Sequence, residues 1–148
     1  KSLKKYDGVF LNGNGEEVSE IINIIKNINP GLPIFQARYL PLNLEKFDKN
    51  KNYIAFSGIG NPNSFIKTLK KNNFKVIKNL NFPDHYNYLS QDLIKIKEIA
   101  KKMNAKIITT EKDFNRLDKS SAEDIEYLEV KLKIINEKEL VNFINKKL

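Results

Sequence analysis

The opening of the chain pairs a short apolar run with a longer amphipathic stretch. Residues 9–11 read Val-Phe-Leu and are followed by Asn-Gly-Asn-Gly at 12–15, which predicts a buried strand and then a loop. Residues 16–27 place isoleucine and valine at helical spacing, and acids in the first turn complement the helix dipole. The Asn-Pro-Gly sequence at 29–31 predicts the end of this helix.

The segment over residues 32–47 has a different pattern. Alternate side chains from 34 to 40 would lie on opposite faces of an extended chain. Pro30, Pro33 and Pro41 lie close by, and proline lacks the N–H that a central strand needs. We therefore expect an edge strand or a linking β-ribbon here, and not a central strand.

Strands and helices alternate in the rest of the chain. Asn61 and Pro62 have the residue types of an N-cap and a first helical position, and Ser90 is expected to cap the next helix. The apolar patterns predict strands at 53–56, 74–80, 106–109 and 127–134, and helices at 61–71, 91–103 and 136–147. This alternation predicts an α/β fold, a three-layer sandwich with a mainly parallel sheet, in a single domain over residues 1–148.

Ligands of parallel sheets bind beyond the carboxyl ends of the strands. Four predicted loops lie there: residues 12–15, 57–61, 81–89 and 110–113. We expect the functional residues to gather in these loops.

Composition narrows the classes of protein that this chain can belong to. Its 148 residues are 41% hydrophobic, as in ordinary globular proteins, and no apolar run approaches the roughly 20 residues of a membrane-spanning helix. The chain has no cysteine and one histidine. Disulfides, thiolate metal sites, cysteine nucleophiles and histidine-rich metal sites are therefore excluded.

The net charge is +8, and lysine supplies nearly all of the positive charge. Arg38 and Arg116 are the only arginines among 26 basic residues. Nucleic-acid readers rely on arginine for bidentate contacts, so we expect no nucleic-acid partner. Between Ser57 and Pro83 there is no acid, and the run could meet a phosphorylated or membrane-bound substrate or form a solvated face. Its basic residues are Lys67, Lys70, Lys71, Lys75 and Lys78.

The loop over residues 82–88 contains the only histidine, His85, directly after Asp84. An imidazole beside a carboxylate can act as a general base or orient one. A loop histidine without a catalytic task is the competing interpretation.

A glycine-containing segment follows the strand predicted at 53–56. Gly58, Gly60 and Asn61 could cradle an anion with backbone N–H groups at the start of a helix. A tight turn between strand and helix is the other interpretation, because no complete phosphate-binding motif is present.

Polar residues also follow the strand predicted at 106–109. Thr110, Glu111, Lys112 and Asp113 place a hydroxyl, two carboxylates and an ammonium within one turn. Thr110 and Asp113 have capping-box spacing, and Arg116 lies three residues beyond Asp113 on the same helical face. A helix cap with a surface ion pair and a functional site are both compatible with this pattern.

Taken together, the motifs resemble those of tetraacyldisaccharide 4′-kinases of lipid A biosynthesis. They read Ala-Phe-Ser-Gly-Ile-Gly-Asn-Pro at 55–62, Phe-Pro-Asp-His-Tyr at 82–86 and Thr-Thr-Glu-Lys-Asp at 109–113. Residues 3–13 are similar to a family segment that ends in Asn-Gly, and residues 32–41 resemble the ribbon that links the two lobes of the family.

The resemblance implies an activity and roles for residues. Complete members transfer the γ-phosphate of ATP, with Mg²⁺, to the 4′-hydroxyl of a tetra-acylated disaccharide 1-phosphate at the cytoplasmic face of the inner membrane. His85 falls on the family histidine that partners an aspartate of the N-terminal lobe, and Asp84 matches the acid before it. Tyr86 stands where many members have a second histidine, so a second histidine is not needed there. The glycine segment and the Thr110–Arg116 segment would shape the cleft.

The chain lacks one motif that the resemblance requires. It contains no Gly-x-x-x-x-Gly-Lys-Ser/Thr loop, begins with Lys1 and holds a single methionine, Met103. We therefore expect the C-terminal lobe of such a kinase, with residues 32–47 as the inter-lobe ribbon. An N-terminal P-loop lobe would hold ATP and Mg²⁺, and this chain alone would hold no metal or cofactor and be inactive.

Two other functions stay open. A non-catalytic α/β module could bind anionic lipid or RNA through its lysines, although the scarcity of arginine argues against RNA. A free-standing nucleotide-binding enzyme would need a complete phosphate-binding motif, which the sequence lacks.

Overall fold

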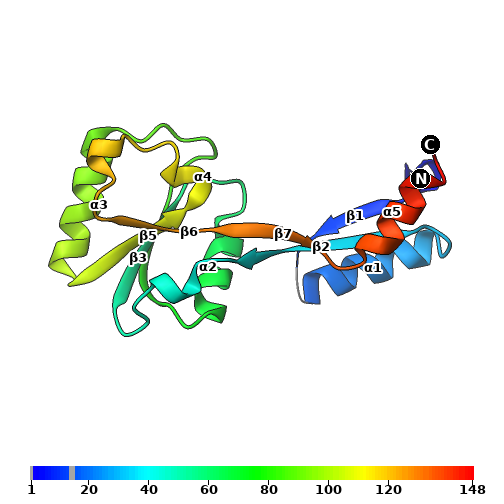
Figure 1. Cartoon of the computed structure of the whole chain (residues 1–148), viewed down its shortest axis with the longest axis horizontal. Helices are drawn as coiled ribbons and strands as arrows, with labels where there is room; N and C mark the ends of the chain where they lie inside the picture. Colours follow the sequence, from blue (N-terminus) through cyan, green and yellow to red (C-terminus); the bar gives the residue numbers. More distant parts are fainter. Residues whose placement is uncertain (1, 14–15) are drawn as a thin grey trace. The chain divides into compact units, whose positions relative to one another are not determined.

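The computed structural model describes residues 2–13 and 16–148 (Figure 1). Its contacts divide the chain into two compact units, one formed by Lys1–Leu40 with Lys131–Leu148 and the other by Pro41–Val130. Each unit has a sheet of its own. The single α/β domain that we expected is therefore replaced by two units.

The second unit contains a four-stranded parallel sheet, which Figure 1 shows and which confirms the predicted α/β class. Its strands lie in the order β4-β3-β5-β6. They are β3 (Asn52–Ser57), β4 (Lys75–Asn81), β5 (Ala105–Thr110) and β6 (Ile125–Leu128). Because β3 and β5 are central, their apolar residues are buried on both faces.

Helices cover both faces of this sheet and complete three layers. On one face Phe56 of β3 belongs to the same core cluster as Leu93 and Ile96 of α3 (Ser90–Lys102). On the other face Tyr53 packs in a cluster with Phe65 and Leu69 of α2 (Pro62–Lys71). Alternation of side chains along β3 thus separates the two cores. Short helical turns complete the unit: η2 (Leu44–Lys46), α4 (Glu111–Phe114) and η3 (Lys119–Ser121).

Of the caps predicted for the helices α2 and α3, the first is confirmed and the second is not. The side chain of Asn61 accepts a hydrogen bond from the backbone N–H of Ser64 at 3.1 Å, with Pro62 at the first helical position. Ser90 is wrong as a cap, because it is already helical and Leu89 occupies the N-cap position. There the Asp92 carboxylate accepts the Leu89 N–H at 3.0 Å, so the acid supplies the cap.

The first unit contains a three-stranded sheet in the order β1-β2-β7. Its strands are β1 (Val9–Asn12), β2 (Ile34–Pro41) and β7 (Val130–Ile134), and its helical elements are η1 (Ser2–Lys5), α1 (Glu16–Ile28) and α5 (Glu137–Asn145). β1 is parallel to β2, whereas Figure 1 shows β7 running opposite to β2. Of the two alternatives predicted for residues 32–47, an edge strand or a linking ribbon, the edge strand is wrong, because β2 is central in its sheet. Pro33 lies outside this strand and Pro41 is its last residue, so neither removes a donor from its middle.

The strand predicted at 127–134 is two strands that belong to different sheets. β6 ends at Leu128 and β7 begins at Val130. Between them, the Glu129 N–H donates to the Asn43 side chain at 3.0 Å, and the Glu129 carbonyl accepts the Leu42 N–H at 2.9 Å. Both backbone groups of Glu129 are therefore used by residues 42–43, and β6 cannot continue beside β5.

Substitution of Asn43 tests this junction. Its buried side chain also donates to the Tyr127 carbonyl at 3.0 Å, so Asn43→Ala leaves two backbone groups without partners. We expect the free energy of unfolding to fall by about 2–4 kcal/mol, measured by urea denaturation. The exposed Asn63→Ala is the control and should differ from the original chain by less than about 0.5 kcal/mol. Equal stability of the two variants would contradict the assigned role of Asn43.

Candidate active site at the carboxyl edge of the four-stranded sheet

Three of the four predicted loops meet at one edge of the parallel sheet. The Phe82 N–H donates to the Ser57 carbonyl at 2.9 Å, and the His85 N–H donates to the Gly58 carbonyl at 3.1 Å. The Gly58 N–H in turn donates to the Asp113 carboxylate at 3.0 Å. The loops after β3, β4 and β5 are thus joined directly. The fourth, residues 12–15, follows β1 of the first unit, and its residues 14–15 lie outside the part of the chain that the structure describes.

Gly58 is required where these loops meet. A Cβ atom at this position would lie 3.0 Å from the Pro83 carbonyl oxygen and 3.0 Å from Tyr88 Oη. Gly60 has more room, since its nearest neighbour would be an Asp84 carboxylate oxygen at 3.4 Å. Residues 58–61 therefore form a close-packed turn, and the N–H of Gly58 already donates to the Asp113 carboxylate. This supports the turn interpretation over the anion cradle.

The carboxylate of Asp113 is buried and fully surrounded by donors. Its Oδ2 accepts the Gly58 N–H and the Thr110 hydroxyl, the latter at 2.7 Å. Its Oδ1 lies 3.4 Å from Nη1 of Arg116. The Asp113 N–H also donates to the Thr110 hydroxyl oxygen at 3.1 Å, which confirms the predicted helix cap. Arg116 follows α4 and reaches back across one turn, as the spacing predicted.

His85 is held by its backbone and presents its ring at the surface. Its φ angle is +60°, in the left-handed region, and its N–H contacts both Gly58 and the Asp84 carboxylate, the latter at 3.0 Å. The side chain is 70% exposed. Nδ1 of the ring lies 3.0 Å from Nη2 of Arg116, and Nε2 lies 3.9 Å from Asp84 Oδ2. An approaching ligand can therefore reach this ring.

Charged side chains of two loops surround the imidazole. Lys112 Nζ lies 3.8 Å from Asp84 Oδ1, which links the loop after β5 to the histidine loop a second time. Glu111 contributes through its backbone carbonyl, which accepts the Asn115 N–H at 3.1 Å. Asp84 and Arg116 are thus brought to His85, and Lys112 is brought to Asp84.

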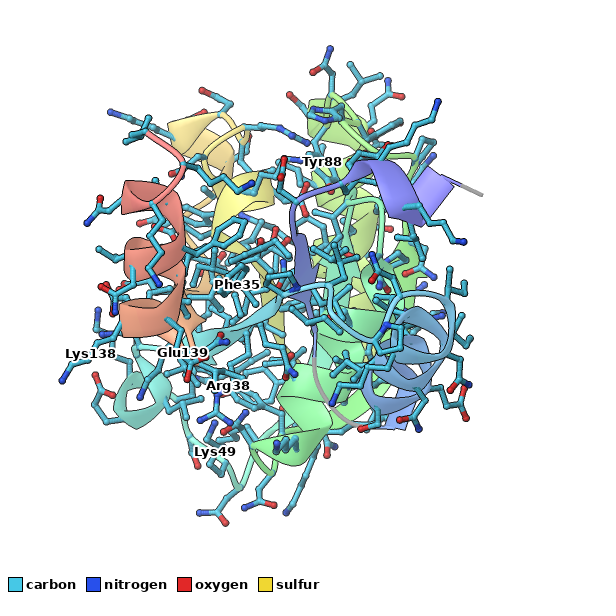
Figure 2. The ribbon with its side chains drawn as sticks, turned by 90° about the vertical axis from the view of Figure 1, so that its right-hand side faces the viewer. Phe35, Arg38, Lys49, Tyr88, Lys138 and Glu139 are labelled. Atoms are coloured by element: carbon cyan, nitrogen blue, oxygen red, sulfur yellow. The ribbon has the colours of Figure 1, made fainter. Side chains whose placement is uncertain are left out.

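An aromatic cluster supports the histidine loop from below and was not singled out from the sequence. The rings of Phe56, Phe82, Tyr86 and Tyr88 contact one another, with centroid distances between 4.9 and 6.3 Å. The Tyr86 hydroxyl donates to Asp92 at 3.1 Å, and this hydrogen bond raises the pKa of Tyr86. Burial, and next the nearby charge of Asp113, raise the pKa of Tyr88, which is labelled in Figure 2. The dense aromatic spacing at 82–88 was the available signal for this cluster.

Three lysines of the run, Lys70, Lys71 and Lys75, lie away from this edge. Lys75 pairs with Asn52 at the start of β3, whereas Ser57 at the end of β3 pairs with Asn81. Lys70 and Lys71 end α2, which places them near the start of β4. These lysines therefore do not line the candidate site, and the solvated-face interpretation fits them.

No group of three histidine, aspartate or glutamate side chains suited to a metal ion occurs among residues 2–13 and 16–148. Within the same residues, no helix is long and apolar enough to span a membrane.

Comparison with known proteins decides the family. A family model described as LpxK, tetraacyldisaccharide-1-P 4′-kinase, matches residues 1–148. The chain belongs to this family. The tetraacyldisaccharide 4′-kinase of Pelagibacter ubique (strain HTCC1062) is 48% identical over 141 residues, which cover 95% of this chain and 45% of that protein. That of Rickettsia bellii (strain OSU 85-389) is 40% identical over 136 residues, which cover 87% of this chain and 42% of that protein.

A solved structure is also similar. The crystal structure of the "apo" form of LpxK from Aquifex aeolicus in complex with ATP has a TM-score of 0.48 and 24% sequence identity. The match covers 93% of this chain and 51% of that one. The chain thus spans about half the length of the relatives that it matches. The family model and the curated relatives confirm the resemblance found in the motifs.

Replacement of Gly58 tests the close packing of the loops. Gly58→Ala should lower the free energy of unfolding by about 1–3 kcal/mol, because the added methyl group meets the Pro83 carbonyl oxygen and the Tyr88 hydroxyl. The matched control is Gly31→Ala, where the nearest atom would be 3.9 Å away. This control should be neutral or slightly stabilising, by less than about 1 kcal/mol. Urea denaturation of both variants measures the difference, and a neutral Gly58→Ala would contradict the packing.

Replacement of Tyr88 tests its environment through pH. A pKa above the ordinary value of about 10 adds stability that is complete at lower pH and is lost as the pH rises above about 10, where the unfolded chain ionises first. Tyr88→Phe should therefore lose less stability than the original chain between about pH 7 and about pH 11, measured by urea denaturation. Some loss remains, because the pKa of Tyr53 is raised as well. Identical losses in both chains would contradict the assigned environment of Tyr88.

Proposed function

We propose that this chain is the C-terminal lobe of a kinase that phosphorylates the 4′-hydroxyl of tetraacyldisaccharide 1-phosphate to give lipid IVA. Membership of the family supports the reaction class. The observation that carries the proposal for this chain is His85, an exposed imidazole fixed at the carboxyl edge of a parallel sheet. This is where such sheets bind ligands.

The chemistry of the site fits assistance to a hydroxyl group. Phosphoryl transfer depends mainly on positioning of the reactants and on stabilisation of charge, and a side chain activates the attacking oxygen. His85 offers a ring nitrogen that solvent can reach, with Asp84 beside it. In the proposed complex, His85 contacts an aspartate of the other lobe, and the two together activate the 4′-hydroxyl.

The remaining parts of the reaction come from outside this sequence. The chain has no Gly-x-x-x-x-Gly-Lys-Ser/Thr motif to hold the phosphates of ATP. We propose that an N-terminal P-loop lobe binds ATP and Mg²⁺, and that the present chain binds neither by itself. Residues 32–47, which include β2 and η2, would then connect the lobes.

The acceptor in this proposal is a lipid, which implies work at a membrane surface. We therefore propose that the complete enzyme is peripheral to the cytoplasmic face of the inner membrane. Lys70, Lys71 and Lys75 lie toward the opposite edge of the sheet from His85, so they are not assigned to the reacting phosphate groups.

Substitution of His85 in the complete enzyme tests the proposal. His85→Asn keeps a residue type that tolerates a positive φ, and it should lower kcat by about 10²–10⁴-fold with ATP and the acylated disaccharide phosphate. The matched control is Asn87→Ala in the same exposed loop, which should leave kcat within about twofold. The 148-residue chain alone should show no turnover. An unchanged kcat in His85→Asn would remove His85 from the reaction.

A further inference from the structure

We infer that Arg116, anchored by the buried carboxylate of Asp113, is a positioning residue that holds the His85 imidazole as a hydrogen-bond donor at Nε2. The inference deepens the proposed function and rests on it for its catalytic meaning. The structural part of the inference is which nitrogen of the His85 ring carries the proton, and this can be measured without an activity assay.

The anchor is Asp113, whose side chain has no exposure to solvent. Gly58 N–H and the Thr110 hydroxyl bind one carboxylate oxygen, at 3.0 and 2.7 Å. The other oxygen faces Nη1 of Arg116 at 3.4 Å. A buried carboxylate requires a compensating charge, so the guanidinium is drawn to this position and its side chain is only 21% exposed.

The second nitrogen of the same guanidinium determines the state of the histidine. Nη2 of Arg116 lies 3.0 Å from Nδ1 of His85. A guanidinium carries only donors and does not lose its proton in proteins. Nδ1 must therefore accept, and in the neutral ring the proton resides on Nε2.

The other charged groups around the ring agree with this state. Asp84 Oδ2 lies 3.9 Å from Nε2, on the side where the N–H is placed. Lys112 lies beyond Asp84, at 3.8 Å from its other oxygen, and so does not compete for Nδ1. Arg116 and Asp84 therefore both favour the acceptor role for Nδ1 and the donor role for Nε2.

The backbone of His85 is held independently of Arg116. Its N–H contacts the Gly58 carbonyl and Asp84, and these bonds do not involve the guanidinium. Replacement of Arg116 should therefore release the ring without releasing the loop. This separates positioning of the imidazole from folding of the site.

The consequence for the proposed reaction is a definite division of roles. A ring that donates from Nε2 and is blocked at Nδ1 does not take the proton of the 4′-hydroxyl directly. It orients a carboxylate by donating to it, and that carboxylate, supplied by the other lobe, accepts the proton. Asp113 and Arg116 thus act on the reaction through His85, without touching the acceptor lipid.

The test uses the fact that His85 is the only histidine of the chain. The 148-residue chain, labelled with ¹⁵N-histidine, is studied by long-range ¹H–¹⁵N correlation at about pH 9, in the range where free imidazole is neutral. We expect a lone-pair signal for Nδ1 and an N–H signal for Nε2. A proton on Nδ1, or comparable amounts of both forms, overturns the inference.

Two variants complete the measurement. Arg116→Lys keeps a positive charge beside Asp113, and so the fold. A single ammonium group does not replace the two guanidinium nitrogens that contact Asp113 and His85. We expect it to give a mixture of the two ring forms, whereas the control Lys112→Gln keeps the original spectrum. An unchanged spectrum in Arg116→Lys also overturns the inference.

Activity of the complete enzyme separates this inference from the proposed function. Arg116→Lys should lower kcat by about 10–10²-fold with little change in KM, as expected for a misplaced catalytic group. If the spectrum is as expected and His85→Asn keeps full activity, the positioning of the ring stands and the proposed function fails. If His85→Asn is inactive and the spectrum is not as expected, the proposed function stands and this inference fails.

Discussion

A carboxylate that is closed off from water needs hydrogen-bond donors, and Asp113 obtains them from three places. Its oxygens meet the backbone N–H of Gly58 from the loop after β3, the hydroxyl of Thr110 at the end of β5, and the guanidinium of Arg116 after α4. Loss of a partner would leave a buried charge without compensation, which is costly in a protein interior. The positions of the loops at this edge are therefore determined largely by the hydrogen bonds that the buried Asp113 carboxylate requires.

The same constraint explains why the histidine loop is ordered although it is exposed. Gly58 gives its N–H to Asp113, which turns its carbonyl toward the His85 N–H. Because that position has no space for a side chain, Tyr88 and Pro83 can approach the glycine closely. A surface imidazole is thus supported by a buried charge and a packed aromatic layer beneath it.

The sequence allowed the individual helices and strands to be predicted, but it did not show how all of the strands pair in the two sheets. Periodicity identified the parallel α/β unit and the loops that meet at its edge, because hydrophobic spacing reports which face of each element is buried. It predicted an edge strand or a linking ribbon where β2 is central in its sheet, since the prolines were counted without knowing that the strand stops at Pro41. It joined β6 to β7, because no local signal shows that Asn43, distant in sequence, binds the backbone of Glu129. The motif at 110–113 was compatible with a helix cap and with a functional site. The structure shows the cap, and it also shows that Asp113 is buried, which the sequence did not indicate.

The hydrogen bond between the Leu42 N–H and the Glu129 carbonyl joins the two ends of residues 41–130, so this unit resembles a domain inserted into the first unit. The chain enters this unit and leaves it at two points that are hydrogen-bonded to each other at 2.9 Å. An insertion whose ends are adjacent can change in length or sequence without pulling apart the strands that flank it, since the ends are already closed into a loop. Evolution could therefore vary this unit, or exchange it whole, while the flanking β2 and β7 keep their pairing.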